Sequence, residues 1–369
     1  MKTIKSSFLT IGLLAVICGS ASAQWVKQTV NTTASFRGLS VFNEKVVWAS
    51  GTGGTVIRTI DGGATWKVMT VPGAEKLDFR DIEAFDANTA YILSIGKGDS
   101  SRIYKTVDGG KTWKLQFKNT NEKAFFDAMA CWDKNSCIAM SDPVANRFVL
   151  IETKDGGDSW SLIDTSKMPA TKDGEAAFAA SGTCLMTQGK NTAILVSGGN
   201  DARVFKSVDR GHSWWIYETP IIKGTAGSGI FSIAMKDAMN AVIVGGNYEK
   251  PDERKDVLAL TTDGGKSWKP GTGLTGYRSG VAYIDKKTIV AVGTNGSDMS
   301  FDGGIIWTRL DTLNVNPTKL NPTEWKVLKV SYNAVQANGL SAIWAVGSEG
   351  TVSRYSHFAD MVLGNRPQR

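Results

Sequence analysis

Histidine is nearly absent from this chain: 2 of its 369 residues are histidine, His212 and His357. Two histidines are too few to favour a metal centre with imidazole ligands or catalysis by a Ser-His or Cys-His pair. The 4 cysteines include no Cys-x-x-Cys pair of the redox or zinc-binding kind. We expect neither a metal site nor a cofactor.

Charge of one sign and long apolar runs are also scarce. The 42 Lys and Arg residues exceed the 35 Asp and Glu residues only mildly, and they are spread along the chain without a dense basic run. This distribution is typical of a solvated surface, so we expect no nucleic-acid partner. No apolar run after residue 23 is long enough for a transmembrane helix, which predicts a mature chain without a membrane-spanning segment.

The first 23 residues have the pattern of a secretory signal peptide. Lys2 and Lys5 precede an apolar stretch at Phe8–Cys18, and the small residues Ala21–Ala23 follow it. The pattern predicts cleavage after Ala23 and export to a periplasmic or extracellular compartment.

Export would place three cysteines in an oxidising environment. Cys131 and Cys137 flank a predicted turn at Asp133–Asn135, so a disulfide can form across that hairpin. Two reduced, half-buried thiols are the alternative. Cys184 has no obvious partner.

One short motif, Ser/Thr-x-Asp-x-Gly-x-Thr/Ser-Trp, occurs six times, first as TIDGGATW at Thr59–Trp66. The fourth copy has Arg210 in place of the first glycine, and the sixth has Ile306 in place of Thr or Ser. The motif aspartates, 39–54 residues apart, are Asp61, Asp108, Asp155, Asp209, Asp263 and Asp302. This spacing suits one four-stranded propeller blade for each copy.

Short apolar runs of strand length precede the motifs and occur seven times, with no helical periodicity. The last unit ends at Gly350–Ser356 without an outer strand, whereas Gln24–Val30 resembles an outer strand without a unit. We therefore predict an all-β, seven-bladed propeller over residues 24–357. Its N-terminal strand completes the last blade, which closes the ring and removes open sheet edges. Residues 358–369 form a C-terminal tail.

The motif belongs at the turn between the third and fourth strands of a blade. Its second glycine supplies a positive φ, its Asp accepts hydrogen bonds from the turn, and its Trp packs beside the turn. Because this role recurs once in each blade, we interpret the aspartates as structural and expect no catalytic residue among them.

The motif resembles the Asp-box, or BNR repeat, of bacterial sialidases, sortilin-like receptors and the photosystem II stability/assembly factor family. The spacing, with a box in almost every blade, is most similar to that of the assembly factors and their non-photosynthetic bacterial relatives. This resemblance implies a non-catalytic propeller that binds a protein partner and helps to assemble or stabilise an extracytoplasmic complex. Because one fold hosts many roles, the resemblance bears more on the fold than on the function.

The innermost strand of each predicted blade begins on the face opposite the Asp-box turns, where propellers of this kind usually carry function. The candidate binding residues at these strand starts are Arg37, Arg80, Asp127, Glu175, Arg278 and Lys326. Four cations near a central mouth could bind a carboxylate, sulfate or phosphate group. In the alternative, they pair with Asp127 and Glu175 in a ring of ions that plugs the channel.

A glycan-active or glycan-binding propeller is the alternative function. By resemblance to sialidases, Arg37, Arg80 and Arg278 could mimic the catalytic arginine triad, with Tyr277 beside one of them. The sequences FRGL and FRDI, however, lack the proline of the sialidase Phe-Arg-Ile-Pro signature. Nothing supports an oxidoreductase, since GTGG at residues 51–54 lies in a predicted hairpin with no following helix to hold a pyrophosphate.

Overall fold

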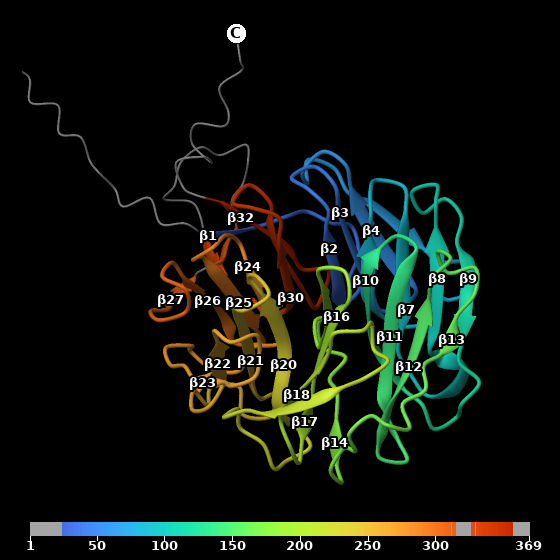
Figure 1. Cartoon of the computed structure of the whole chain (residues 1–369). Helices are drawn as coiled ribbons and strands as arrows, with labels where there is room; N and C mark the ends of the chain where they lie inside the picture. Colours follow the sequence, from blue (N-terminus) through green and yellow to red (C-terminus); the bar gives the residue numbers. More distant parts are fainter. Residues whose placement is uncertain (1–23, 311, 315–325, 329, 357–369) are drawn as a thin grey trace, which may run out of the picture.

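The computed structural model describes residues 24–310, 312–314, 326–328 and 330–356. They form a seven-bladed β-propeller, as predicted (Figure 1). Each innermost strand packs against that of the next blade, and the innermost strand of the last blade packs back against that of the first. The predicted signal peptide and C-terminal tail lie outside the described residues, as does His357.

Each of the first four blades has four strands, which follow one another in the chain from the axis outwards. Blade 1 is β2 (Phe36–Val41), β3 (Val47–Gly51), β4 (Thr55–Thr59) and β5 (Lys67–Thr70). Blade 2 is β6 (Phe79–Ala84), β7 (Ala90–Ser94), β8 (Arg102–Thr106) and β9 (Lys114–Lys118), with a 3₁₀ turn at Gly98–Ser100 between β7 and β8. Blade 3 is β10 (Phe126–Asp133), β11 (Ser136–Val144), β12 (Arg147–Thr153) and β13 (Ser161–Leu162). Blade 4 is β15 (Leu185–Gln188), β16 (Thr192–Val196), β18 (Arg203–Ser207) and β19 (Trp215–Glu218).

The last three blades follow the same order, and two of them carry additional strands. Blade 5 is β20 (Ser228–Met235), β21 (Ala241–Asn247), β22 (Leu258–Thr261), β23 (Lys269–Pro270), extended inwards by β17 (Gly198–Gly199) and β14 (Glu175–Ala176). Blade 6 is β24 (Gly280–Tyr283), β25 (Ile289–Gly293), β26 (Gly296–Ser300), β27 (Thr308–Leu310). Blade 7 is β30 (Tyr332–Ala337), β31 (Ile343–Gly347), β32 (Val352–Ser356), β1 (Gln24–Lys27), extended outwards by β28 (Thr312–Asn314) and β29 (Lys326–Leu328).

The hydrophobic core lies between neighbouring blades. The second strands, such as β3 and β31, are buried along their whole length because both faces of a blade pack against other blades. Outer strands such as β5 are mostly exposed. This explains why the second strands read in the sequence as continuous apolar runs.

The N-terminal strand closes the ring as predicted. β1 pairs antiparallel with β32, with Trp25 opposite Tyr355, and Figure 1 shows the two strands side by side. Trp25 is fully buried, and its indole N–H donates to Ser297 Oγ of blade 6 at 2.8 Å. The first and last parts of the described chain are therefore held in one blade. The additional strands β28 and β29 were not anticipated from the sequence.

The Asp-box turns have the predicted structure. Thr59 Oγ1 donates to Asp61 Oδ1 at 2.7 Å, while Thr65 donates its N–H to Oδ1 at 2.9 Å and its hydroxyl to Oδ2 at 2.5 Å. These bonds, chiefly the one from the Thr65 hydroxyl, lower the pKa of Asp61 to about 2. Arg210 keeps the fourth turn by adopting a φ of 61°. The carboxylates are thus used in shaping the turns.

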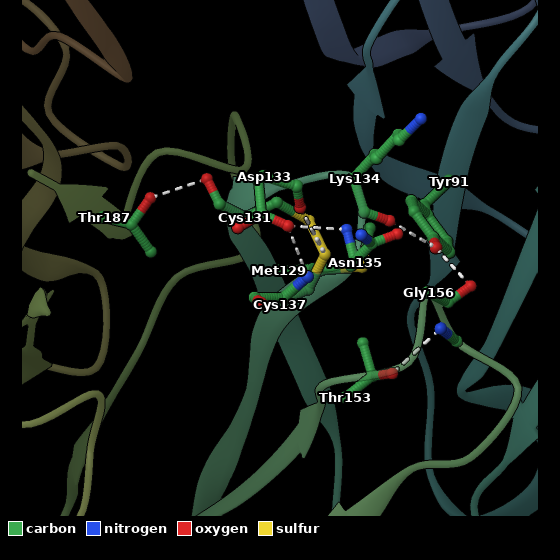
Figure 2. Close-up of a disulfide and its surroundings, with 12 residues drawn as sticks. Tyr91, Met129, Cys131, Asp133, Lys134, Asn135, Cys137, Thr153, Gly156 and Thr187 are labelled. Carbon is green, nitrogen blue, oxygen red and sulfur yellow. Dashed lines mark hydrogen bonds between the residues drawn. A yellow bond between two sulfur atoms is a disulfide. The ribbon is translucent and has the colours of Figure 1, made fainter. Parts of the chain in front are cut away.

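A disulfide joins Cys131 to Cys137 across the β10–β11 hairpin (Figure 2). The hairpin turn is fixed by Asp133, whose Oδ1 accepts the N–H groups of Asn135 at 2.7 Å and Ser136 at 3.0 Å. Of the two alternatives for this cysteine pair, the structure has the bonded one. Cys184 is a buried free thiol.

Two of the predicted innermost-strand starts are wrong. Glu175 lies on β14, whereas the innermost strand of blade 4 is β15; the connection before β15 is longer than in other blades. Lys326 lies on β29, at the outer edge of the blade 7 sheet, whereas β30 is innermost. In both units the chain carries extra residues before the innermost strand, so this strand begins later in the sequence than predicted.

Candidate functional site

A cavity of about 350 Å³ opens at the axis of the propeller, on the face opposite the Asp-box turns. Two arginines from the starts of β2 and β6 line it, together with loops that follow the second strands of blades 5 and 6. We call it the mouth pocket; its lining residues are Arg37, Arg80, Phe178, Ala179, Ala180, Phe231, Tyr248, Tyr277, Thr294 and Asn333.

A β-bulge lies near the start of the innermost strand in five blades. In each of β2, β6, β10, β20 and β30, the strand register skips one residue at this point. A bulge leaves the extra residue unpaired and redirects its side chain. The five bulge residues are Arg37, Arg80, Asp127, Phe231 and Asn333. All of them except Asp127 line the mouth pocket.

Residues 177–184, which we call the axial segment, cross from the end of blade 3 to β15 and form one wall of the pocket. Ala177 N–H donates to Asp142 Oδ1 at 2.9 Å, and Ser181 Oγ donates to the Ser279 carbonyl at 2.8 Å. The hydroxyl of Thr183 lies 2.6 Å from that of Ser232. The segment is therefore bonded to blades 3, 5 and 6.

The two arginines hold the same segment from the other side. Arg37 Nη1 donates to the Ala180 carbonyl at 3.1 Å, and Arg80 Nη1 donates to the Ala179 carbonyl at 3.2 Å. Arg80 also forms an ion pair with Asp78, with 2.7 Å between Nε and Oδ2. The charge of Arg80 is thus compensated within the protein.

Arg37 differs because no described carboxylate lies within ion-pair distance of it. Burial lowers the pKa of Arg37, and the nearby charge of Arg80 lowers it further, while Tyr277 and Asp78 offset this only in part. A guanidinium has five N–H donors, and one carbonyl does not exhaust them. A partly buried cation without a counterion favours an anion in the adjacent cavity.

Aromatic rings form the other side of the mouth pocket. Phe178 of the axial segment stacks on Phe231, with ring centroids 3.8 Å apart and planes within 3°. Tyr277 meets Phe231 edge-on at 4.8 Å, and Tyr248 does so at 6.3 Å. Gly198 leaves room for Phe178, since a Cβ there would lie 2.1 Å from its ring.

Two other predicted site residues are engaged elsewhere. Arg278 is fully buried in blade 6, where its Nε donates to Asp298 Oδ2 at 2.9 Å and its Nη1 to Asn295 Oδ1 at 2.6 Å. Glu175 accepts from Arg203 Nε at 2.9 Å and from Ser197 Oγ at 2.6 Å. Of the two alternatives for the mouth, the structure does not have the ring of ions, because Arg278 pairs with Asp298 in blade 6 and Glu175 pairs with Arg203 of blade 4. The side chain of Lys326 lies outside the described part of the chain.

Asp127 does not line the mouth pocket but lies near Cys184, at the end of the axial segment. It is buried, and its Oδ2 has no hydrogen-bond partner among the described residues. Burial and the nearby Asp142 raise the pKa of Asp127 well above its usual value. Burial also raises the pKa of Asp81 to about 7 and that of Asp142 to about 6. These three carboxyls, which we call the acidic layer, lie around the axial segment. None of them forms an ion pair with a described arginine, although the charge of Arg80 acts on Asp127.

The arrangement contains no sialidase-like triad among the described residues, since Arg278 is paired with Asp298 away from Arg37 and Arg80. No cluster of three described His, Cys, Asp or Glu residues could hold a metal ion. No helix in the described ranges has the length and apolar character needed to cross a membrane. The mouth pocket has one cationic side and one aromatic side.

The fold and the site define a seven-bladed propeller of the Asp-box class. A family model described as photosynthesis system II assembly factor YCF48 matches residues 17–114. The chain resembles YCF48 in whole fold as well. It is similar to the structure of YCF48 bound to a D1 peptide, with a TM-score of 0.64, 15% identity, and coverage of 90% of this chain and 94% of that one.

Two further solved structures illustrate the range of this likeness. YCF48 from Cyanidioschyzon merolae has a TM-score of 0.63 and 17% identity, covering 91% of this chain and 99% of that one. The GH74 enzyme of Niastella koreensis has a TM-score of 0.57 and 15% identity, covering 89% of this chain and 53% of that one. No curated protein matches the sequence significantly. At these identities the structural likeness supports the fold alone, and function has to be argued from the residues of the mouth pocket.

Proposed function

We propose that this protein is an exported, non-catalytic propeller that binds a protein partner at its mouth pocket and helps to assemble or stabilise an extracytoplasmic complex. The observation that carries the proposal is Arg37, a partly buried cation that forms no ion pair with any described carboxylate and lies at the edge of a cavity of about 350 Å³. Burying such a charge costs free energy unless an anion compensates it. A carboxylate on a partner would do so.

Two other observations support parts of this proposal. The fold is similar to that of YCF48, which has been seen with a bound D1 peptide. The Cys131–Cys137 disulfide suits an oxidising compartment, in agreement with the predicted signal peptide. The client of the present protein would be an envelope or extracellular protein.

The test is an affinity purification of the mature chain, residues 24–369, from envelope extract of its own source organism. Each captured protein is identified by mass spectrometry, purified, and titrated against wild type and an R37A/R80A variant. Loss of the two guanidiniums should weaken binding by about tenfold or more. The matched control is K286A/K287A, which removes the same charge from two exposed lysines on the Asp-box face.

A partner that binds wild type and the control equally, and R37A/R80A at least tenfold more weakly, supports the proposal. Equal binding by all three proteins would contradict it. Hydrolysis of sialoside or other glycoside reporters by wild type, with no protein partner, would instead favour the glycan-active alternative.

A further inference from the structure

We propose that the mouth pocket recognises one composite group, a carboxylate next to an aromatic side chain. In this inference, which rests on the proposed function, the carboxylate lies on Arg37 and the ring lies beside Phe178 and Tyr248. The carboxylate has two sources with the same chemistry: the end of a polypeptide chain, or an Asp or Glu side chain.

The size of the cavity limits what it can hold. Ligand pockets typically have volumes of roughly 300–1,000 Å³, so about 350 Å³ is at the small end. That volume suits one large side chain together with the acidic group next to it. The axial segment forms a wall of the cavity, so a longer stretch of partner would have to lie outside the pocket.

The cationic side selects a planar anion. Arg37 offers a guanidinium fork, which matches a carboxylate in a bidentate arrangement. Its position is set twice, by the bulge in β2 and by the hydrogen bond from Nη1 to the Ala180 carbonyl at 3.1 Å. The cation is therefore held in place before a ligand arrives.

The aromatic side is also held in place by its neighbours. Phe231 and Tyr277 are almost fully buried, and together they fix the ring of Phe178 from its face. Gly229 adopts a φ of 143°, and a Cβ there would meet the backbone of Gly198 at 2.2 Å. Two glycines thus allow two strands to approach closely, which makes room for the Phe178–Phe231 stack.

Tyr248 shows that this side is open to a ligand. Its side chain is 48% exposed at the rim of the pocket, although it is a large aromatic residue. An added ring can pack against Phe178 and Tyr248, since aromatic side chains favour stacked or edge-on contact with one another.

The two sides are close enough for one ligand to reach both. Arg37, Phe178, Tyr248 and Tyr277 all line one cavity of about 350 Å³, and Tyr277 meets Phe231 edge-on at 4.8 Å. A carboxylate on Arg37 therefore lies near the rings, within the reach of one residue and its neighbour. This adjacency predicts specificity for the pair of groups rather than for either one alone.

The experiment is a calorimetric titration of the mature chain, with saturation-transfer NMR for weak binding, against five synthetic peptides. The first three are acetyl-Gly-Gly-Gly-Phe as free acid, the same peptide as C-terminal amide, and acetyl-Gly-Gly-Gly-Ala as free acid. The other two carry a side-chain carboxylate: acetyl-Gly-Phe-Asp-Gly amide and acetyl-Gly-Ala-Asp-Gly amide. Each is measured on wild type, R37A, Y248A and the control W215A, which removes an exposed ring on the outer strand β19.

At least one of the two phenylalanine acids should bind at least tenfold more tightly than its alanine counterpart. If that one is the peptide with the free C-terminal carboxylate, it should also bind more tightly than its amide. R37A should abolish the preference for the acid, Y248A should reduce the preference for the ring, and W215A should change neither. Which phenylalanine acid binds more tightly identifies the source of the carboxylate.

Binding that ignores the ring, or no binding by any peptide, would overturn this inference. If R37A/R80A still loses its captured protein partner in that case, the proposed function stands without the composite group. If that partner is retained as well, both proposals fail.

Discussion

At the scale of single residues, the same amino acid has different roles according to its partners. Arg37 lies at the start of β2, and Arg278 lies just before β24. The sequence placed both among the candidate binding residues at the mouth of the channel. Arg278 is neutralised by Asp298 inside blade 6, whereas Arg37 faces the cavity without a counterion among the described carboxylates. Sequence position could not separate them, because the direction of a side chain depends on a bulge in β2 that Arg278 does not share.

The motif aspartates give a residue-scale prediction. Substitution of Asp155 by Ala should lower the melting temperature by roughly 2–6 °C, because the N–H of Ser159 at 3.0 Å and two hydroxyl groups lose their acceptor. Thermal melts followed by circular dichroism measure this. The control is Asp158→Ala in the same turn, where only an exposed ion pair with Lys114 at 3.3 Å is lost. A melting temperature of D155A equal to that of D158A would argue against the structural role.

At the scale of elements, much of the architecture could be predicted. Repeat spacing, apolar runs and the unpaired first strand were enough for seven blades and the closure by β1. The bulge positions were predicted less completely: Arg37, Arg80 and Asp127 were candidates from the sequence, whereas Phe231 and Asn333, which line the mouth pocket, were missed. The sequence does contain a signal for them. When the unit starts FRGL, FRDI, FDAM, IFSI and YNAV are aligned, the bulge residue is the second letter of each.

The axial segment and the β28–β29 extension were not predictable in the same way. Both are insertions into units of the repeat, and a repeat pattern says nothing about where an insertion goes. The path of residues 177–184 is set by contacts with residues far away in sequence, such as the Ser181–Ser279 hydrogen bond. The aromatic side of the mouth pocket depends on this path, because Phe178 belongs to the segment.

The sixth Asp-box gives a prediction at the element scale. In five boxes the Thr or Ser at the seventh motif position donates its hydroxyl to the motif carboxylate. In the sixth box this position is Ile306, which has no hydroxyl and is 69% exposed, so Asp302 keeps only one hydroxyl bond, from Ser300. Ile306→Thr should therefore raise the melting temperature, by roughly 1–3 °C, through a new bond to Asp302 Oδ2. Ile305→Thr is the control, since it removes the same apolar surface one position away. An equal rise in both variants would assign the gain to the lost apolar surface instead.

At the scale of the whole molecule, two sets of carboxyls act on stability in opposite directions. The Asp-box groups have lowered pKa values, about 2 for Asp61 and Asp155, owing to their turn hydrogen bonds. Their contribution is present above the usual Asp pKa and is lost as the pH falls from about 4 towards 2. The groups of the acidic layer have raised pKa values, so their contribution is present below about pH 4 and is lost as the pH rises towards 7. The free energy of unfolding should therefore be highest in mildly acidic solution, near pH 4 to 5.

Asp81 should account for a large part of the decline towards neutral pH. It is buried, its pKa is about 7, and it accepts the N–H groups of Met129 at 2.6 Å and Ile82 at 2.8 Å. Asp81→Asn keeps one of the two acceptor oxygens and cannot ionise. The variant should be less stable overall, but its unfolding free energy should fall less between pH 4 and 7 than that of wild type. Urea denaturation at intervals of half a pH unit measures this difference. Asp285→Asn, an exposed carboxyl on the Asp-box face, should leave that part of the profile unchanged. A D81N profile parallel to that of wild type would mean that this carboxyl is already compensated in the folded protein, and the acidic layer would then not shape the pH dependence of the propeller.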